Sequence, residues 1–179
     1  QMHAIQTSGN CIRNTTTDQF AGVISDEVAD PRPYCEIIRQ WSTFHPEFTY
    51  LPRKFKIAFT LPPENDVDVY AQDLSFVAIE KEGKLLGYDI LAGGGMGYAY
   101  GNPGSFPRLA DIIGFCFPEQ VEEVARQVLL IHKEFSTRCN RKTSRLRYTI
   151  AGKGLDWFTN ELATRLPFPL QAAKIGRAH

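Results

Sequence analysis

The ten residues Leu51–Thr60, with the sequence LPRKFKIAFT, constrain the fold more than any other stretch of the chain. Beyond Arg53 the side chains alternate, which is the pattern of a β-strand with one buried face. The residues expected to face the core are Phe55, Ile57 and Phe59. The residues expected to face the other way are Lys54, Lys56, Ala58 and Thr60. The stretch therefore predicts a half-buried strand that carries two lysines on one face.

The two lysines would lie about 7 Å apart along this strand. No acidic residue lies between Tyr50 and Pro63 to neutralise them locally. Two like charges held side by side repel each other, so the arrangement is favoured when an anion lies over them. The same pattern also fits an ordinary strand with a solvated lysine face. The rest of the chain must distinguish these two interpretations.

Length and composition fit a single globular domain, because 179 residues with 43% hydrophobic content suffice for a substantial core. Basic and acidic residues number 20 each, so no net field draws the chain to nucleic acid or membrane. The chain shows no signal peptide and no membrane-spanning apolar run, and we expect a cytoplasmic protein. It begins at Gln1 rather than at a methionine, and we expect it to be a domain of a longer chain.

The four cysteines are far apart in the sequence. They are Cys11, Cys35, Cys116 and Cys139. None forms a C-x-x-C pair or has a histidine at metal-ligand spacing. The pattern is typical of reduced intracellular thiols, so we expect no metal ligand in this chain.

Strand and helix signals alternate along the chain. We expect helices over residues 31–44, 118–135 and 155–166, a hairpin with arms 76–80 and 84–92, and short strands at 2–7 and 67–70, with a turn at 61–66. The first helix would present Ile37, Ile38, Trp41 and Phe44 to the core. This pattern predicts an α+β (α/β) single domain, a mixed sheet packed against two to three helices.

Three further segments could complete an anion site. The polar segment Ser8–Asp18 contains one cation, Arg13; the loop Gly93–Gly97 has four glycines that could present bare N–H groups; and Asn140–Arg147 is strongly basic, either helical or extended. Each also has a plain structural interpretation, as a surface loop, a flexible loop and a solvated basic face. The glycine loop fits neither GxGxxG nor a Walker loop, so it gives nucleotide binding little support.

Three stretches together resemble the sulfite and nitrite reductase hemoproteins, which carry siroheme and a [4Fe-4S] cluster. They are TSGNCIRNTTTDQFAG, the run from LPRKFK to the downstream GGG, and CNRKTSRLRYTI. The similarity is greatest to assimilatory sulfite reductase hemoproteins. It covers residues 1–168, which the resemblance identifies as one siroheme-facing lobe, and leaves 169–179 as a tail expected to be poorly ordered.

The resemblance implies roles for individual residues. Arg13, Lys54 and Lys56 match the substrate-binding cations of the family. The match implies siroheme contacts for a second set: Arg53, Gly93, Gly94, Gly95, Asn140, Arg141, Arg145 and Arg147. Fixed cations suit this chemistry, because siroheme bears carboxylates and sulfite is an anion.

Two departures limit what this chain can do alone. The family's cluster cysteines come as two close pairs, which are absent here, and one further substrate arginine belongs to a segment upstream of Gln1. We therefore expect a lobe that acts with the remaining domains and with an electron donor, a flavoprotein subunit or ferredoxin. By itself it should neither hold the cluster nor turn over substrate.

Two alternatives stay open from the sequence. The first is an ammonia-forming nitrite reductase of the same family, in which asparagine commonly replaces the second lysine; Lys56 favours sulfite. The second is a single-stranded nucleic-acid-binding domain, with Lys54, Lys56 and Arg141–Arg147 as an electrostatic track and Phe55 and Tyr148 as stacking platforms. Its requirement for an exposed Phe55 conflicts with the alternation of the strand.

Overall fold

The computed structural model describes residues 6, 8–25, 27–61 and 66–175. Their strands are β1 (Ile12–Thr16), β2 (Phe55–Thr60), β3 (Leu74–Lys81), β4 (Lys84–Ala92) and β5 (Asp111–Cys116). They form one sheet in the order β1-β2-β3-β4-β5. Strands β1, β2 and β3 run parallel, whereas β4 is antiparallel to both β3 and β5. The predicted mixed sheet is confirmed.

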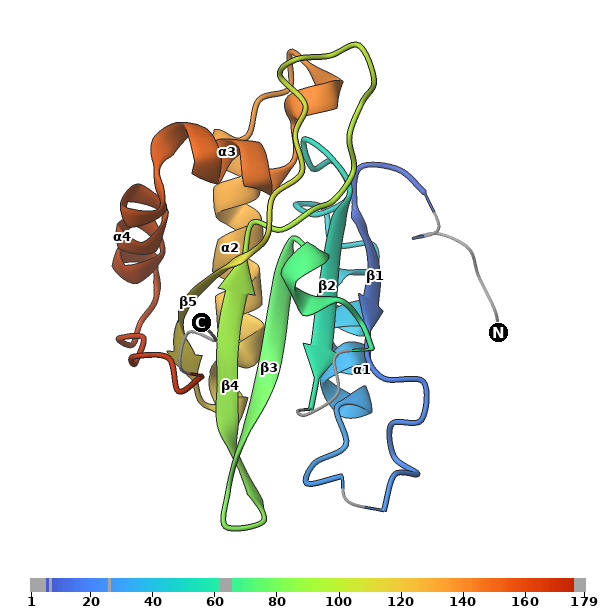
Figure 1. Cartoon of the computed structure of the whole chain (residues 1–179), viewed down its shortest axis with the longest axis vertical. Coiled ribbons are helices and arrows are strands. Elements are labelled where there is room, and N and C mark those ends of the chain that lie inside the picture. Colours follow the sequence, from blue (N-terminus) through green and yellow to red (C-terminus); the bar gives the residue numbers. More distant parts are fainter. Residues whose placement is uncertain (1–5, 7, 26, 62–65, 176–179) are drawn as a thin grey trace.

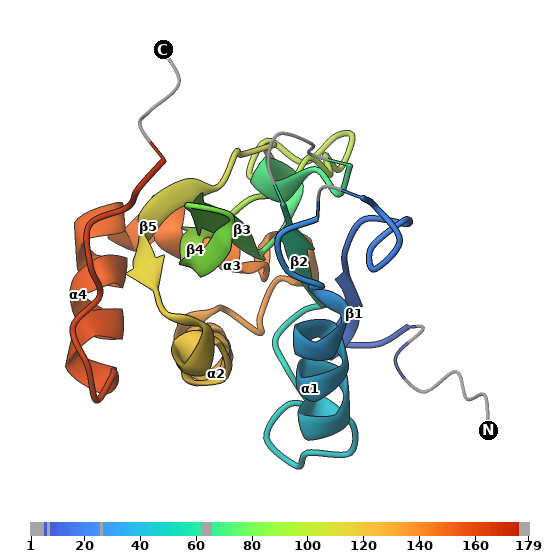
Figure 2. The same cartoon turned by 90° about the horizontal axis from the view of Figure 1, so that it is seen from below.

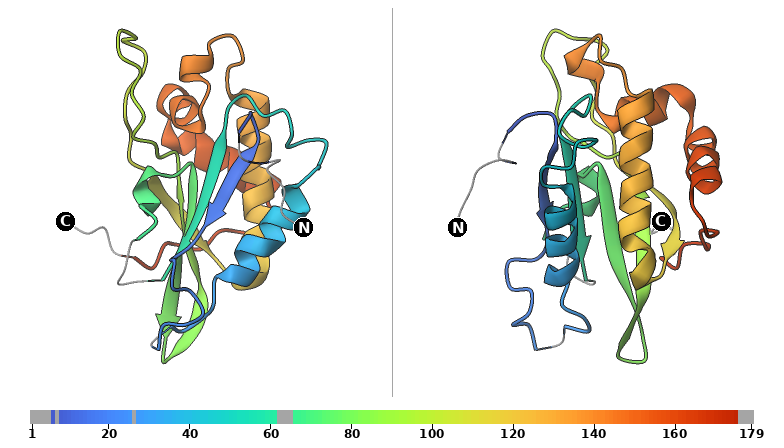
Figure 3. Two further views of the ribbon diagram at one scale, coloured as in Figure 1. Left: turned by 90° about the vertical axis from the view of Figure 1, so that its right-hand side faces the viewer. Right: turned by 180° about the vertical axis from the view of Figure 1, so that it is seen from behind.

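Four α-helices accompany the sheet in the described residues: α1 (Arg32–Ser42), α2 (Val121–Phe135), α3 (Leu146–Lys153) and α4 (Leu155–Arg165). Short 3₁₀ turns occur at Val69–Ala71 (η1), Pro118–Gln120 (η2) and Arg141–Thr143 (η3). Helices α1 and α2 cover one face of the sheet, and α4 lies beside α2 (Figures 2 and 3). The helix beyond the expected two or three is α3, in the basic segment whose conformation the sequence left open. No described helix has both the length and the apolar composition needed to cross a membrane.

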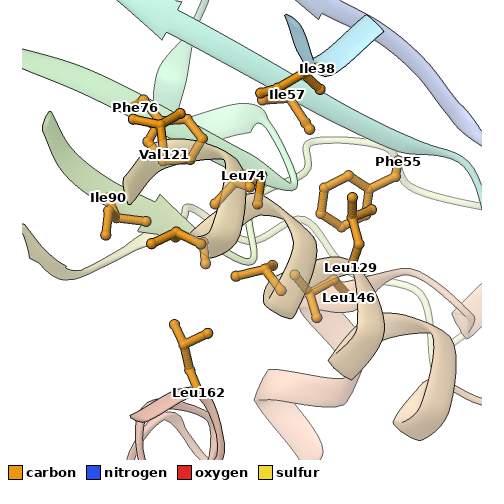
Figure 4. Packing of buried hydrophobic residues seen from close by; sticks show 14 of the residues in the cluster. Ile38, Phe55, Ile57, Leu74, Phe76, Ile90, Val121, Leu129, Leu146 and Leu162 are labelled. Atoms are coloured by element: carbon orange, nitrogen blue, oxygen red, sulfur yellow. The ribbon is translucent and has the colours of Figure 1, made fainter. Parts of the chain in front are cut away.

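The core lies between the sheet and these helices (Figure 4). Phe55, Ile57 and Phe59 of β2 are completely buried in it, as the alternation predicts. Each such side chain contributes about 1.5–3 kcal/mol through burial. Lys54 and Lys56 are partly exposed. Ala58 and Thr60 are buried as well, because η1 packs against β2, β3 and β4.

Several local predictions are wrong. Residues 67–70 do not form a strand; η1 occupies this segment, after Asp68 in a left-handed conformation with φ of 52°. Helix α1 ends at Ser42, and the chain leaves it so that Phe44, with φ of 62°, is 70% exposed. Ile37 is exposed as well. The expected strand at 2–7 and the turn at 61–66 rest mostly on residues 2–5, 7 and 62–65, outside the described residues.

The C-terminal segment contacts β4 and β5 as far as the structure describes it. Gln171 forms a β-bridge with Phe115 of β5. The N–H groups of Lys174 and Ile175 both donate to the buried Asp89 carboxylate of β4. A buried carboxylate needs such donors, and the tail supplies them. Residues 176–179 lie outside the described part of the chain.

Candidate functional site

The sheet gathers the predicted site segments at one of its ends. Because β1, β2 and β3 are parallel and β4 is antiparallel to β3, the starts of the first three strands and the end of β4 lie at the same end of the sheet. The long loop after β4, η3 and the start of α3 lie at this same end, the upper one in Figure 1. Segments far apart in the sequence are thus brought together by the directions of the strands and by the position of α3.

A pocket of about 380 Å³ opens at this end. Its lining residues are Arg53, Lys54, Gly97, Tyr98, Ala99, Ser105, Arg141, Lys142, Arg145 and Arg147. Six of these ten side chains are cationic, and none is acidic. The pocket is therefore an electropositive cavity suited to a polyanionic ligand.

One cation of the pocket, Arg145, forms an ion pair with a buried carboxylate, that of Asp73. Arg145 donates to the carboxylate of Asp73 through Nε at 3.1 Å and Nη2 at 2.6 Å. Asp73 is 0% exposed and also accepts the backbone N–H of Lys56 at 3.0 Å. Burial raises the pKa of Asp73, an effect that the Arg145 guanidinium opposes. Asp73 thus ties α3 to β2 through one carboxylate.

Other guanidinium groups keep unused donors. Within the described residues, Nη1 of Arg53 and both Nε and Nη1 of Arg147 are buried without a hydrogen-bond partner. Arg147 uses only Nη2, which donates to the Gly97 carbonyl and to the Tyr148 hydroxyl at 2.8 Å. Its guanidinium carbon lies 4.7 Å from the centre of the Tyr148 ring. Buried donors without acceptors are costly, so they indicate a place for ligand oxygens.

Burial and the repulsion between cations lower the pKa values of two pocket residues, Arg53 and Lys54. Burial is the largest influence lowering the pKa of both Arg53 and Lys54. The charges of Arg13 and Arg145 lower both further, and Arg141 adds to the effect on Arg53. An anion bound here would relieve this repulsion.

The glycine loop acts differently from the expectation. The N–H groups of Gly93, Gly94 and Gly95 donate to the carbonyls of Asp73, Gln72 and Arg108, respectively, so they are not bare. These glycines instead allow other groups to approach the loop backbone closely. A Cβ at Gly94 would lie 2.3 Å from the Tyr70 carbonyl oxygen, and one at Gly95 would lie 2.2 Å from Nη1 of Arg147. The glycines therefore let the loop pack against η1 and the arginines of α3.

The predicted residues converge only in part. Arg13 donates to the Gly9 carbonyl at 3.0 Å and lines a second hollow, of about 390 Å³, between β1 and α1. Its charge nevertheless reaches both Arg53 and Lys54. Asn140 caps η3 by accepting the N–H of Lys142 at 3.0 Å. Neither it, Arg13 nor Lys56 is among the residues lining the cationic pocket.

Sequence reasoning missed Asp73 and the pocket residues Tyr98, Ala99 and Ser105. An isolated acidic residue directly before the apolar strand 74–79 was the available signal for Asp73. For the nucleic-acid alternative, Phe55 is completely buried and cannot stack on a base. No group of three or more His, Cys, Asp or Glu side chains arranged to hold a metal occurs in the described residues.

Comparisons with known proteins show the family of this chain. Residues 8–170 match the family described as the nitrite and sulphite reductase 4Fe-4S domain. Over 126 residues, 70% of this chain, the chain is 51% identical to the sulfite reductase [NADPH] hemoprotein beta-component of Oceanobacillus iheyensis and 53% identical to that of Myxococcus xanthus. The matched part spans only 22% of the length of each of these relatives.

The fold has a counterpart among solved structures. The Mycobacterium tuberculosis NirA protein superposes with a TM-score of 0.81 and 29% sequence identity, over 94% of this chain and 30% of that one. A dissimilatory sulfite reductase, DsrI, matches with a TM-score of 0.58 at 12% identity, which shows the shared fold alone. The chain belongs to the nitrite and sulphite reductase 4Fe-4S domain family.

Proposed function

We propose that this domain forms one wall of the siroheme and substrate site of a sulfite reductase hemoprotein. The observation that carries the proposal is the cationic pocket in which Arg53 and Arg147 keep buried, unpartnered guanidinium donors. The family match and the two hemoprotein relatives give the pocket its expected ligand. Reduction of sulfite to sulfide would require the rest of the parent chain.

The residues present fit siroheme, whose carboxylates are the acceptors that the orphaned guanidinium groups need. Arg53, Arg141, Arg145 and Arg147 would hold these carboxylates, since guanidinium binds carboxylate through paired hydrogen bonds. When bound, siroheme supplies an iron that receives the electrons for the reduction. The [4Fe-4S] cluster would be held by another part of the parent chain.

Lys54 and the charges beside it would act on the substrate anion. Burial lowers the pKa of its ammonium group, and the charges of surrounding cations lower it further. Such a group binds an anion strongly and gives up a proton more readily than a free lysine does. Lys54 can therefore both hold an anionic oxygen and deliver a proton to it as the S–O bond breaks. Arg13 and Lys56 would add charge from the neighbouring strand positions.

The partners follow from this function. The remaining domains would complete the site, and a flavoprotein subunit or ferredoxin would deliver electrons. The physiological substrate would be sulfite, with nitrite as the alternative within the same family. The free state of all four cysteines supports a reducing, cytoplasmic location.

A spectrum and one variant test the proposal. The parent protein should show siroheme absorbance, and Lys54→Met should raise the sulfite KM or lower kcat, with a loss of about tenfold or more in kcat/KM. Lys84→Met, on the exposed hairpin, is the matched control and should leave kcat/KM unchanged. A colourless parent protein, or equal kcat/KM in both lysine variants, would contradict the proposal.

A further inference from the structure

A buried chain of three polar side chains ends on the backbone of the cationic pocket. His132 of α2 is 0% exposed, and its Nε2 lies 3.3 Å from the Arg53 carbonyl oxygen. Its Nδ1 lies 2.7 Å from Oγ of Ser136, which in turn lies 2.6 Å from Oγ1 of Thr149 on α3. Ser136 and Thr149 are buried as well. The Arg53 end of the chain is 79 residues from His132 in sequence.

The direction of every hydrogen bond in this chain is fixed. The Arg53 carbonyl can only accept, so Nε2 of His132 must carry the hydrogen. Burial lowers the pKa of His132 to about 4, so the ring is neutral and Nδ1 is an acceptor. The Ser136 hydroxyl therefore donates to Nδ1, and the Thr149 hydroxyl donates to Ser136. One tautomer and one ring orientation satisfy all four groups.

The same imidazole also packs beside the next part of β2. Its ring centre lies 5.4 Å from that of Phe55, while the Phe55 N–H donates to the Cys11 carbonyl at 3.0 Å. The carbonyl before Lys54 and the ring after it are thus both held by His132. Lys54 and Arg53 project from this clamped segment into the pocket.

We propose that His132, held in one tautomer by Ser136 and Thr149, is a positioning residue that fixes the Arg53–Lys54 backbone and so directs both cations at the bound anion. This inference rests on the proposed function of the pocket and adds a determinant of its geometry. Interactions on rigid, preorganised groups bind a developing charge better than mobile ones do. His132 itself touches neither substrate nor cofactor.

A pair of substitutions separates positioning from packing. In His132→Gln the side-chain amide can still donate to the Arg53 carbonyl, whereas His132→Met fills a similar volume without a donor. In the parent hemoprotein we expect His132→Met to raise the sulfite KM about tenfold. We expect the sulfite KM of His132→Gln to stay close to that of the wild type. Both variants should lower the thermal unfolding midpoint and keep the siroheme absorbance. Equal KM values for the two variants would overturn the proposal.

The tautomer gives a readout that does not depend on activity. Imidazole ¹⁵N chemical shifts of the 179-residue chain should show His132 protonated at Nε2 alone. Ser136→Ala removes the donor to Nδ1, so the Nδ1 shift should move toward that of an imine nitrogen without a hydrogen bond, while Nε2 keeps its hydrogen. Ser75→Ala is the matched control, because Ser75 is a buried serine that donates to Val69 at 2.8 Å, away from Arg53. It should lower the unfolding midpoint while leaving the His132 shifts unchanged, and in the parent hemoprotein it should leave the sulfite KM unchanged. An unchanged Nδ1 shift in Ser136→Ala would also count against the proposal.

Failure of this inference and failure of the proposed function are distinguishable. If Lys54→Met leaves the sulfite KM and kcat unchanged, the function assigned to the pocket is wrong. If Lys54→Met impairs the enzyme and His132→Met does not, the function assigned to the pocket is supported and only the positioning role of His132 is wrong.

Discussion

Arg145 and Asp73 form a buried ion pair across 72 residues of sequence, with the Asp73 carboxylate at 0% exposure and Arg145 at 13%. The same carboxylate accepts the N–H of Lys56, so one acidic group holds the start of α3 against β2. The arrangement holds the backbone of the other pocket cations where a ligand can meet them. Asp73 is therefore a structural centre of a site whose chemistry is cationic.

Replacing Asp73 should be costly. Asp73→Asn leaves the Arg145 guanidinium mostly buried without its counter-charge, and such changes destabilise by about 3–5 kcal/mol. Glu36→Gln is the matched control, because it breaks the exposed pair with Arg39, which solvent screens, and should cost much less. Urea denaturation of both variants measures the difference. A cost for Asp73→Asn as small as that of Glu36→Gln would show that the pair is not a determinant of stability.

A glycine beside the pocket should respond to alanine differently from one outside it. A Cβ at Gly95 would lie 2.2 Å from Nη1 of Arg147 and 3.1 Å from Nη1 of Arg145, whereas a Cβ at Gly152, on α3 outside the pocket lining, meets nothing within 4 Å. Gly95→Ala should displace both arginines, reduce siroheme retention by the parent protein and destabilise it by about 1–3 kcal/mol. Gly152→Ala should retain siroheme. Absorbance per mole of protein and thermal unfolding report both effects, and equal retention would contradict the assigned role of Gly95.

The sequence predicted what depends on local patterning. The alternation in β2 correctly placed Phe55 and Ile57 in the core with Lys54 and Lys56 partly exposed, because a period of two follows from strand geometry alone. Strand β1 was missed, because its residues IRNTT look like a polar loop until pairing with β2 makes them a strand. Strand β5 gave no alternating signal.

The parts of the site that the sequence did not predict depend on which segments meet. Asp73 acts on groups 17 and 72 residues away, and His132 on one 79 residues away. No local period reports such contacts; they follow from strand order and from the packing of α2 and α3. The expectation that Gly93–Gly95 present bare N–H groups failed for the same reason, since their acceptors come from distant loops.

Acid should weaken the fold through His132. Burial lowers its folded pKa to about 4, against about 6.5 in an unfolded chain. The neutral ring's contribution is full above pH 6.5 and falls as the unfolded state takes up a proton first, by about 3 kcal/mol down to pH 4. The free energy of unfolding, measured by urea titration at stepped pH, should therefore fall more steeply in the wild type than in His132→Gln. Parallel curves would show that His132 does not titrate as its burial implies.

The chain alone should not assemble an iron–sulfur cluster. Its cysteines are separate in sequence, and burial raises the pKa of Cys35 and Cys116 to about 12, which disfavours the thiolates that iron requires. Anaerobic reconstitution with iron and sulfide should give no stoichiometric cluster and no cluster absorption band. The parent hemoprotein, treated identically, is the positive control. A stable band in the 179-residue chain would refute this expectation.

Substrate preference should depend on Lys56. Lys56 follows Lys54 by two residues, and its charge is among those that lower the pKa of Lys54. The two ammonium groups are therefore close enough to act on the same anion. Sulfite carries more negative charge than nitrite near neutral pH, so it gains more from a second cation. In the parent enzyme Lys56→Asn should lower kcat/KM for sulfite about tenfold more than for nitrite. Lys84→Asn, on the exposed hairpin, should leave the ratio unchanged. Steady-state rates with one chemical electron donor for both substrates give the ratio directly. Equal losses for the two substrates in Lys56→Asn would mean that Lys56 supports the fold of the site rather than its choice of anion.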